Sequence, residues 1–335
     1  MIHKDTKITI LGDGGWGTTL ALLLTGKGYE VKLWGAFPKY VEEIRIKREN
    51  RKFLPGFKIP ENITPVSDIH KACLDSEWVV LAVPSQYMRR VVSSIKKDHI
   101  HHKRFVTVAK GIETQSLKLM SQVIQEELGK VSLAVISGPT IARDVALKMP
   151  SAASVASANS ELASTVRDIF SSDYFSLFES DDILGVELGG SVKNVIAICA
   201  GIIQGLGYGS NTRAVLFARG IAEMARLGDA MGARRQTFTG LSGLGDLATT
   251  CLSPHSRNRW LGEEIGKGRR LNNILDETEM VVEGVETAKA VYRLSKKHKV
   301  PMPISQAVYE ILFHGHDPKE AVRALMNRDS HRELD

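Results

Sequence analysis

Long hydrophobic runs and paired cysteines are scarce in this 335-residue sequence. The longest apolar stretch, VIAICAGII at residues 195–203, is well short of the roughly 20 residues that a membrane-spanning helix needs. The N-terminus leads into a strand-like ITIL without an apolar segment or cleavage site typical of a secretory signal. The three cysteines, Cys73, Cys199 and Cys251, have no CxxC spacing. We therefore expect no integral membrane segment, free thiols and a reducing, cytoplasmic location.

A strong excess of one charge is missing as well. The formal net charge is only +6, and the basic residues are spread along the chain apart from short runs such as KKHK at 296–299. A nucleic-acid binder normally gathers its basic residues on one face within a matching motif. We expect no nucleic-acid partner and instead a small-molecule substrate, since a mild positive balance suits an enzyme of anionic metabolites.

Metal ligands with recognisable spacing are also absent from the sequence. His99, His101 and His102 lie close together in DHIHHK, but no carboxylate or cysteine stands near them at ligand spacing. The sequence therefore predicts no metal site, and this histidine group is interpreted as a polar surface loop before a strand.

The first motif present is glycine-rich. Gly12, Gly14, Gly15 and Gly17 belong to GDGGWG, which follows the strand-like KITIL and precedes an apolar helical stretch. This is GxGxxG in its expected context, where glycines permit a tight turn, close approach of a pyrophosphate and close packing of helix on strand. The helix N-terminus adds amide donors for phosphates. A second strand, EVKLWG, follows and favours a dinucleotide site over a merely structural glycine turn.

The end of that second strand bears on which dinucleotide is bound. A site for NAD commonly carries an acid about 20 residues beyond the motif, where it holds the ribose hydroxyls. Residues 34–39, WGAFPK, contain none. The sequence therefore predicts NADPH or NADH as cofactor and favours NADPH slightly. Lys39 and Arg45 are candidate partners for a 2′-phosphate, or solvated helix residues.

Later strands recur at intervals typical of α/β folds. Strand-like segments lie at 77–85, 104–112 and 133–140, with a further pair at 151–157 and 174–180. Helical patterns separate them, including SLKLMSQVIQEEL at 116–128. From about residue 181 helical segments dominate, at 183–204, 211–232, 256–266, 283–298, 304–313 and 318–327. We predict an α/β N-terminal Rossmann-like domain with a mostly parallel sheet over residues 1–180, followed by an all-α C-terminal domain over 181–335.

One lysine interrupts the apolar segment VELGGSVKNVIAICAGIIQG. Lys193 is expected near the start of a helix, after Gly189, Gly190 and Ser191, whose small side chains would let another backbone or a ligand come close. A buried lysine requires a partner or a function. The alternative is a lysine whose long side chain reaches water and has no role.

Two later segments offer groups suited to a substrate site. GLSGLGD at 240–246 is a glycine-rich turn that ends in an acid, and SRNR at 256–259 begins a helix. Ser, Arg and Asn side by side provide a bidentate donor and two shorter hydrogen-bonding groups that suit a phosphate. SRNR can equally be a solvated helix face.

The motifs taken together resemble one family. GDGGWGTTLA, VPS, AKGIE, VISGPTIARD, VELGGSVKNVIAICAGI, GLSGLGDL, SRNR and VVEGVETAK occur in the order typical of the bacterial-type NAD(P)-dependent glycerol-3-phosphate dehydrogenases. The resemblance covers nearly the whole chain, and GGxxKN, GLGD and SRN are its most specific parts. It implies reversible hydride transfer between NAD(P)H and C2 of dihydroxyacetone phosphate to give sn-glycerol 3-phosphate, a supply for glycerophospholipid synthesis, and a homodimer.

The resemblance also implies roles for individual residues. Lys193 would be the catalytic proton donor and acceptor, with Lys110 of AKG beside it. The substrate site would be lined by Lys110, Gly138, Thr140, Lys193, Asp246, Ser256, Arg257 and Asn258. The nucleotide would be contacted by Gly12, Gly14, Gly15, Trp16, Gly17, Lys110, Ala142, Arg257, Val281 and Glu283. Ala36 departs from the family pattern, because a basic or histidine side chain often stands there.

Two other functions stay open from the residues alone. A relative with the same plan could act on another 2-oxo or 3-hydroxy acid, with SRN binding a carboxylate. A dinucleotide sensor without turnover is the alternative from another class, which the presence of both lysines and GLGD disfavours.

Overall fold

The computed structural model describes residues 6–95, 100 and 102–326, which form two compact units. The first unit contains the chain up to Ala109 together with Met120–Ile183. The second contains Lys110–Leu119 and the chain from Leu184 onward. His99 and His101 of the histidine group lie outside the described residues.

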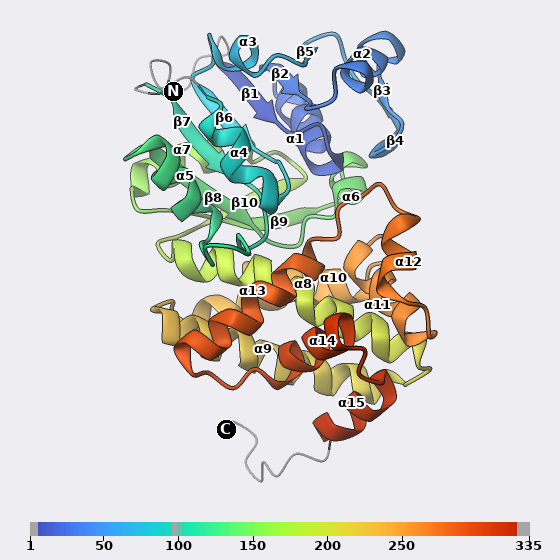
Figure 1. The fold of residues 1–335 in the computed structure, drawn as a ribbon. Coiled ribbons are helices and arrows are strands. Elements are labelled where there is room, and N and C mark those ends of the chain that lie inside the picture. Colours follow the sequence, from blue (N-terminus) through green and yellow to red (C-terminus); the bar gives the residue numbers. More distant parts are fainter. Residues whose placement is uncertain (1–5, 96–99, 101, 327–335) are drawn as a thin grey trace. The chain divides into compact units, whose positions relative to one another are not determined.

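The first unit is built on an eight-stranded sheet (Figure 1). Its strand order is β10-β9-β8-β7-β6-β1-β2-β5, and every neighbouring pair is parallel except β8 with β9. The strands are β1 (Lys7–Leu11), β2 (Glu30–Trp34), β5 (Ile63–Val66), β6 (Trp78–Leu81), β7 (Arg104–Thr107), β8 (Ser132–Ser137), β9 (Ser151–Ser157) and β10 (Phe175–Ser180). Strands β3 (Glu49–Asn50) and β4 (Leu54–Lys58) form a separate two-stranded antiparallel hairpin.

Both faces of this sheet are covered, which explains its nearly continuous apolar strands. Ile8 and Ile10 of β1 belong to one buried cluster, and Leu11 belongs to the other. The helices of this unit are α1 (Gly15–Gly26), α2 (Pro38–Lys47), α3 (Ile69–Cys73), α4 (Met88–Ser93), α5 (Met120–Leu128), α6 (Ala142–Ala146) and α7 (Ser160–Phe170), with a 3₁₀ turn at Ser85–Tyr87. Residues of α1 and α7 line the first cluster, and residues of α4 and α5 the second.

The strand order alone indicates a ligand site at the carboxyl end of β1. From β1 the chain runs to β2 and β5 on one side, then crosses to β6, β7 and β8 on the other. In open α/β sheets ligands bind outside the carboxyl ends of the strands at such a reversal. The glycine-rich turn follows β1 at this point.

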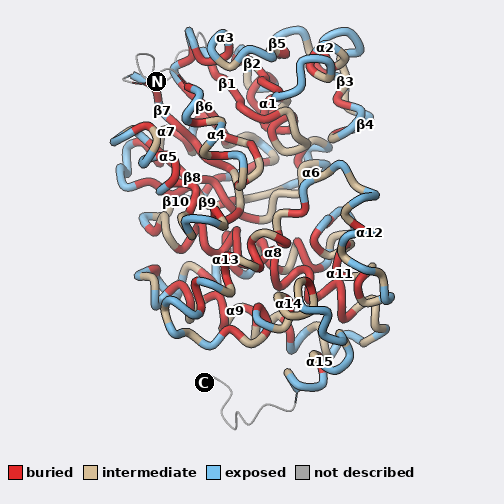
Figure 2. The backbone as a smooth tube through the Cα atoms, viewed as in Figure 1, coloured by how far each residue is buried: buried red, intermediate tan, exposed pale blue. Residues whose placement is uncertain are grey.

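The second unit is helical, which confirms the predicted fold class. It contains α8 (Ile183–Gly205), α9 (Ser210–Met231), a 3₁₀ turn (Arg235–Thr239), a π-helical turn (Leu241–Gly245), α10 (Asp246–Leu252), α11 (Arg257–Gly266), α12 (Leu271–Asp276), α13 (Glu283–His298), α14 (Pro303–His314) and α15 (Pro318–Met326). Every residue of α8 from Gly185 to Ile203 is buried, as its red course in Figure 2 shows. A helix that is buried on all sides belongs to the core of its domain.

Helix α8 extends well beyond the apolar run of residues 195–203, which lies in its C-terminal half. By length and composition it could cross a membrane, with a mean hydropathy of 1.5 in its most apolar window, and it is the one such helix among the described residues. That window is entirely buried inside the structure.

Residues 110–119 were assigned on sequence to the first domain, but the structure groups them with the second unit. Ile112 and Leu119 pair across a β-bridge and join the core of the helical unit. The backbone oxygen of Thr114 accepts a hydrogen bond from Arg293 of α13 at 2.5 Å. The predicted helix at 116–128 is therefore too long, and α5 begins at Met120.

Candidate active site

The positions of the turn after β1 require glycine for different structural reasons. Gly12 has φ +125°, and a Cβ there would lie 2.6 Å from the backbone oxygen of Ala82. A Cβ at Gly17 would collide with the backbone oxygen of Gly12. A Cβ at Gly14 would meet nothing within 4 Å, so open space adjoins this residue at the start of α1. These are the features a pyrophosphate site needs: a tight turn, close helix packing, and room for the ligand.

Other predicted nucleotide residues of the first unit gather around the same helix start. A Cβ at Gly15 would lie 3.7 Å from Cβ of Ala142, the first residue of α6, and Thr19 donates a hydrogen bond to the Ala142 oxygen at 3.0 Å. Trp16 instead packs edge-on against Phe175, with ring centroids 6.2 Å apart. The Trp16 ring therefore packs against the hydrophobic core of the first unit.

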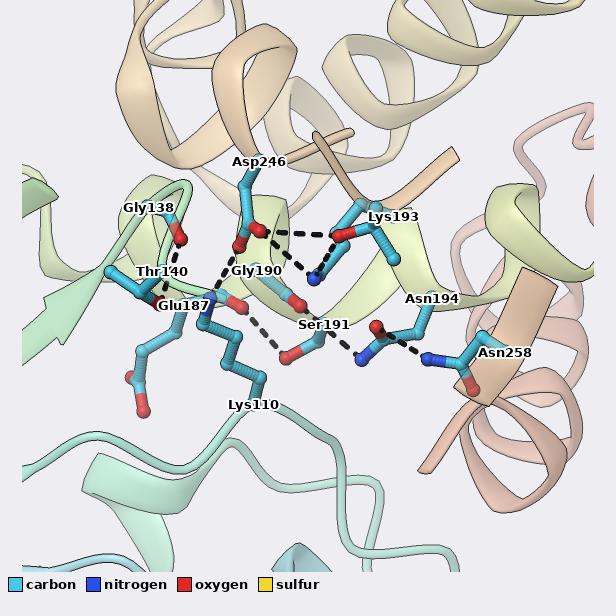
Figure 3. A network of polar contacts seen from close by, with 11 residues as sticks. Lys110, Gly138, Thr140, Glu187, Gly190, Ser191, Lys193, Asn194, Asp246 and Asn258 are labelled. Carbon is cyan, nitrogen blue, oxygen red and sulfur yellow. Dashed lines mark hydrogen bonds and ion pairs between the residues drawn. The ribbon is translucent and has the colours of Figure 1, made fainter. Parts of the chain in front are cut away.

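The end of β8 carries the other predicted residues of this unit. A Cβ at Gly138 would lie 2.7 Å from Cα of Ala153 on β9, so the close pairing of these strands requires glycine. The Thr140 hydroxyl donates to the Gly138 oxygen at 3.1 Å, which folds the SGPT turn back on itself (Figure 3).

In the second unit, Lys193 lies in the middle of α8 and not near its start. Its side chain is only 7% exposed, which rules out a lysine that simply reaches water. Its Nζ lies 2.9 Å from Oδ1 of Asp246 and donates to the Thr250 hydroxyl at 2.5 Å. Thr250 in turn donates to Asp246 Oδ1 at 3.3 Å, closing a three-membered network (Figure 3).

Lys110 reaches the same carboxylate from the 110–119 segment. Its Nζ lies 2.7 Å from Oδ2 of Asp246, so the two oxygens of one carboxylate hold two different lysines. Burial is the largest influence on the pKa of Lys110 and lowers it; Asp246 raises it and the nearby Lys193 charge lowers it, and the net effect is a fall from 10.5 to about 8. The structure therefore brings Lys110, Lys193 and Asp246 together in one buried cluster, hereafter the lysine cluster.

A glycine allows Asp246 to reach this position. A Cβ at Gly189 of α8 would lie 2.5 Å from the backbone oxygen of Ser242 in the π-helical turn. Without a side chain at Gly189 the turn packs directly on α8, and Asp246, the first residue of α10, follows it. The expectation that small residues before Lys193 admit another backbone is confirmed at Gly189.

The SRN segment forms the start of α11. Ser256 is its N-cap and accepts a hydrogen bond from the Arg259 amide at 3.2 Å. Asn258 is buried, donates to Asn194 Oδ1 at 2.8 Å and accepts from the Gly284 amide at 2.9 Å. The segment is therefore more than a solvated helix face.

Arg257, Val281 and Glu283 also come together in the second unit. The exposed guanidinium of Arg257 donates to the Val281 backbone oxygen at 2.8 Å. Glu283 is the first residue of α13, two positions beyond Val281. This arrangement ties the start of α11 to the loop that leads into α13.

Two polar residues of this region were missed from the sequence. Asn194 follows Lys193 directly and holds Asn258, and Thr250 holds Lys193. Thr250 stands four residues after Asp246 on α10, so helical i, i+4 spacing was the signal that could have identified it. Among the described residues no group of three histidine, cysteine or acidic side chains could hold a metal ion.

The chain combines a glycine turn at the reversal point of its sheet with a lysine cluster in a helical unit. This combination is typical of a nicotinamide-dependent oxidoreductase. Family models agree: that for the NAD-dependent glycerol-3-phosphate dehydrogenase N-terminus matches residues 7–163, and that for its C-terminus matches residues 182–323. The chain belongs to the NAD-dependent glycerol-3-phosphate dehydrogenase family.

Individual relatives support this assignment over the full length. The glycerol-3-phosphate dehydrogenase [NAD(P)+] of Citrifermentans bemidjiense is 47% identical over 330 residues, covering 96% of this chain and 97% of the relative. That of Geobacillus kaustophilus is 45% identical over 331 residues, covering 98% and 96%. The crystal structure of glycerol-3-phosphate dehydrogenase from Coxiella burnetii has a TM-score of 0.94 at 37% identity, covering 97% of this chain and 100% of that chain.

Proposed function

We propose that this chain catalyses the reversible reduction of dihydroxyacetone phosphate to sn-glycerol 3-phosphate with NADPH or NADH. The observation that carries the proposal is the lysine cluster, in which Lys193 and Lys110 share the carboxylate of Asp246. The names of the relatives supply the substrate, and the cluster supplies groups suited to the chemistry.

The bound nicotinamide would supply the hydride to C2 of the substrate. Negative charge then develops on the C2 oxygen, where the Lys193 ammonium would stabilise it and donate the proton. Asp246 would keep this ammonium oriented through its 2.9 Å ion pair. Lys110, whose Nζ holds the other oxygen of Asp246, would orient the substrate.

Binding of the substrate phosphate is assigned to the start of α11. Arg257 offers a planar guanidinium on an exposed side chain, and Asn258 is held rigid by its contacts to Asn194 and Gly284. Ser256 would contribute mainly by capping the helix that carries both. Gly138 and Thr140 would complete the substrate contacts.

The nucleotide contacts are proposed for both units. Gly12, Gly14, Gly15, Trp16, Gly17 and Ala142 of the first unit would surround the pyrophosphate turn, supported by the open space beside Gly14. Lys110, Arg257, Val281 and Glu283 of the second unit would supply the others.

The assembly and location belong to the same proposal. A homodimer follows from the resemblance. A cytoplasmic location is supported by three cysteines that are all free and buried. A role in supplying glycerol phosphate for phospholipids follows from the resemblance as well.

The test is oxidation of NADPH and NADH followed by absorbance, with dihydroxyacetone phosphate as substrate. We expect turnover with the phosphorylated ketone and far less with unphosphorylated dihydroxyacetone. Equal efficiency on both ketones would contradict the assignment of Arg257 and Asn258 to the phosphate. Preference for a 2-oxo acid would favour the related enzymes, and nucleotide binding without any turnover would favour a sensor.

A further inference from the structure

An acidic side chain lies at the end of β2 although none follows that strand in the sequence. Gly35 comes directly after β2, and a Cβ built on it would collide with Oδ2 of Asp13 and lie 2.6 Å from its Cγ. Asp13 is the second residue of the glycine-rich turn, which follows the neighbouring strand β1. Its carboxylate therefore occupies the space where a side chain after β2 would project.

The position of Asp13 is fixed by its surroundings. Asn50 of the β3–β4 hairpin donates to the Asp13 backbone oxygen at 2.7 Å and to the Thr18 hydroxyl at 2.7 Å. Asn50 also accepts a hydrogen bond from the Tyr40 hydroxyl at 2.6 Å. The hairpin, α2 and the start of α1 thus hold the aspartate against Gly35.

The carboxylate itself has an unmet requirement. Oδ2 of Asp13 is buried and has no hydrogen-bond partner among the described residues. A buried acceptor without a donor costs free energy that a ligand hydroxyl would recover. In sheets of this topology, the carboxyl end of the second strand is where an acid binds the adenosine ribose.

We propose that Asp13 is a specificity-determining residue for the nucleotide: its carboxylate accepts hydrogen bonds from the ribose hydroxyls of NAD(H) and repels the 2′-phosphate of NADP(H). The inference rests on the proposed function, since it assumes that a nicotinamide dinucleotide binds at this turn. It reverses the slight preference for NADPH that the sequence of residues 34–39 predicted. That prediction considered only an acid that follows β2 along the chain.

The charge of Asp13 depends on pH. Burial raises its pKa to about 6, whereas a hydrogen bond from its own backbone amide and the positive charge of Lys52 lower it. The Tyr40 side chain also interacts with Asp13 electrostatically. At neutral pH and above the carboxylate is ionised, and discrimination against the 2′-phosphate is greatest there. Below about pH 6 Asp13 becomes protonated and the discrimination weakens.

Lys52 is the opposing candidate at this edge. Its Nζ lies 5.3 Å from the ring centroid of Phe53 and 6.0 Å from that of Tyr40. If Lys52 governed the choice of nucleotide, it would attract the 2′-phosphate and favour NADP(H). A Lys52→Met variant therefore provides the matched control for Asp13.

The experiment measures dissociation constants of the full-length protein for NADH and NADPH without substrate, at pH 8 and pH 5.5. Adenosine monophosphate and adenosine 2′,5′-bisphosphate repeat the comparison without the nicotinamide. We expect the wild type to bind NADH at least about tenfold more tightly than NADPH at pH 8, a typical cost of like-charge juxtaposition. In Asp13→Asn the dissociation constants for NADH and NADPH should agree within about threefold. In Lys52→Met the difference between them should be larger than in the wild type.

The pH series separates Asp13 from the 2′-phosphate, whose own pKa is also about 6. Between pH 8 and pH 5.5, the ratio of the NADPH to the NADH dissociation constant should fall more in the wild type than in Asp13→Asn. Equal binding of NADH and NADPH by the wild type, or the same ratio in Asp13→Asn, would overturn the inference while leaving the proposed function intact. If neither nucleotide binds, the proposed function fails as well. Asp13→Ser serves as a second variant should Asp13→Asn not fold.

Discussion

Lys193 holds its ammonium in the buried stretch of α8, where an unpaired charge would be strongly destabilising. Replacement by methionine keeps much of the bulk and removes the charge and the proton. Because Asp246 would retain Lys110 as its partner, we expect Lys193→Met to fold. Its kcat should fall by roughly 10²-fold to 10⁴-fold, the range of one acid–base group.

The NADPH dissociation constant of Lys193→Met should stay near the wild-type value, because the glycine turn binds the pyrophosphate. Steady-state kinetics and a binding titration on the same preparation give both numbers. Near-wild-type turnover would remove Lys193 from the mechanism. Loss of turnover together with loss of nucleotide binding would indicate a structural role instead.

Deprotonation of Lys110 should make the rate of ketone reduction decline at high pH; this decline is called the alkaline limb of the pH profile. Its pKa is lowered to about 8, so its ammonium is present below that pH and is lost as pH rises through it. Ketone reduction that uses this charge should therefore slow above about pH 8. Lys110→Arg keeps its charge throughout the range and should lack the limb. Profiles of kcat from pH 6 to pH 10 test this, and the same limb in both proteins would contradict it.

At the scale of elements, α9 supports the start of α14 through one buried acid. Glu223 accepts hydrogen bonds from the Ile304 amide at 2.5 Å and from the Ser305 amide and hydroxyl at 3.2 and 3.1 Å. These bonds satisfy N–H groups that the first turn of a helix leaves without partners. Burial nevertheless raises the pKa of Glu223 from 4.5 to about 7.

That raised pKa has a defined effect on stability. Between about pH 4.5 and pH 7 the folded protein binds a proton at Glu223 that the unfolded chain has lost, so this group lowers the free energy of unfolding as pH rises. The change is at most about 3 kcal/mol. Urea unfolding at pH 5 and pH 7.5 should show this slope in the wild type and a smaller one in Glu223→Gln. Identical slopes would mean that Glu223 does not titrate in this window.

Helices α8 and α11 approach each other through paired glycines. A Cβ at Gly201 would collide with the backbone oxygen of Arg259, and one at Gly262 with that of Ile198. Gly262→Ala should therefore force the helices apart and reduce the free energy of unfolding by roughly 1–3 kcal/mol. Because Asn194 and Asn258 meet across this contact, the KM for dihydroxyacetone phosphate should rise too.

A matched control comes from α1. Gly26 is also helical, but a Cβ there would meet nothing within 4 Å. Gly26→Ala should leave stability unchanged or raise it by up to about 1 kcal/mol through helix propensity. Thermal unfolding of the two variants compares them directly, and similar losses would show that close packing is not what Gly262 provides.

Elements with a clear period were predictable, and those defined by long-range contacts were not. The continuous apolar runs of β6 and β8 identified buried parallel strands. Residues 116–119 fitted the helical period of α5, yet Leu119 pairs with Ile112 in a β-bridge and the helix begins only at Met120. The short α10 and α12 carried too few apolar residues to show a period.

The whole molecule limits how much of the site a sequence can reveal. Lys193, Asp246 and Lys110 were identified through motifs, and the structure brings them together. Their partner Thr250 had no motif of its own. Asp13 was visible in GDGGWG, but its closeness to Gly35 depends on the packing of β1 beside β2, which sequence separation conceals.

Assembly is a prediction at this scale. A homodimer should give a light-scattering mass of twice the monomer mass at micromolar concentration, with and without nucleotide. A monomeric mass across that range would contradict the prediction. Because NADH and NADPH bind within one chain in our proposal, dissociation of the dimer by dilution should leave their affinity ratio unchanged.

The course of residues 110–119 has a consequence for the order in which the protein is made. Lys110 precedes its carboxylate partner by 136 positions. At a synthesis rate of about 5–20 residues per second, the ribosome needs on the order of ten seconds to deliver Asp246 after Lys110. Until then the segment lacks the helices that bury Ile112 and Leu119. The early sheet can form while the chain is growing, but the lysine cluster can assemble only after α8, α9 and the start of α10 have emerged.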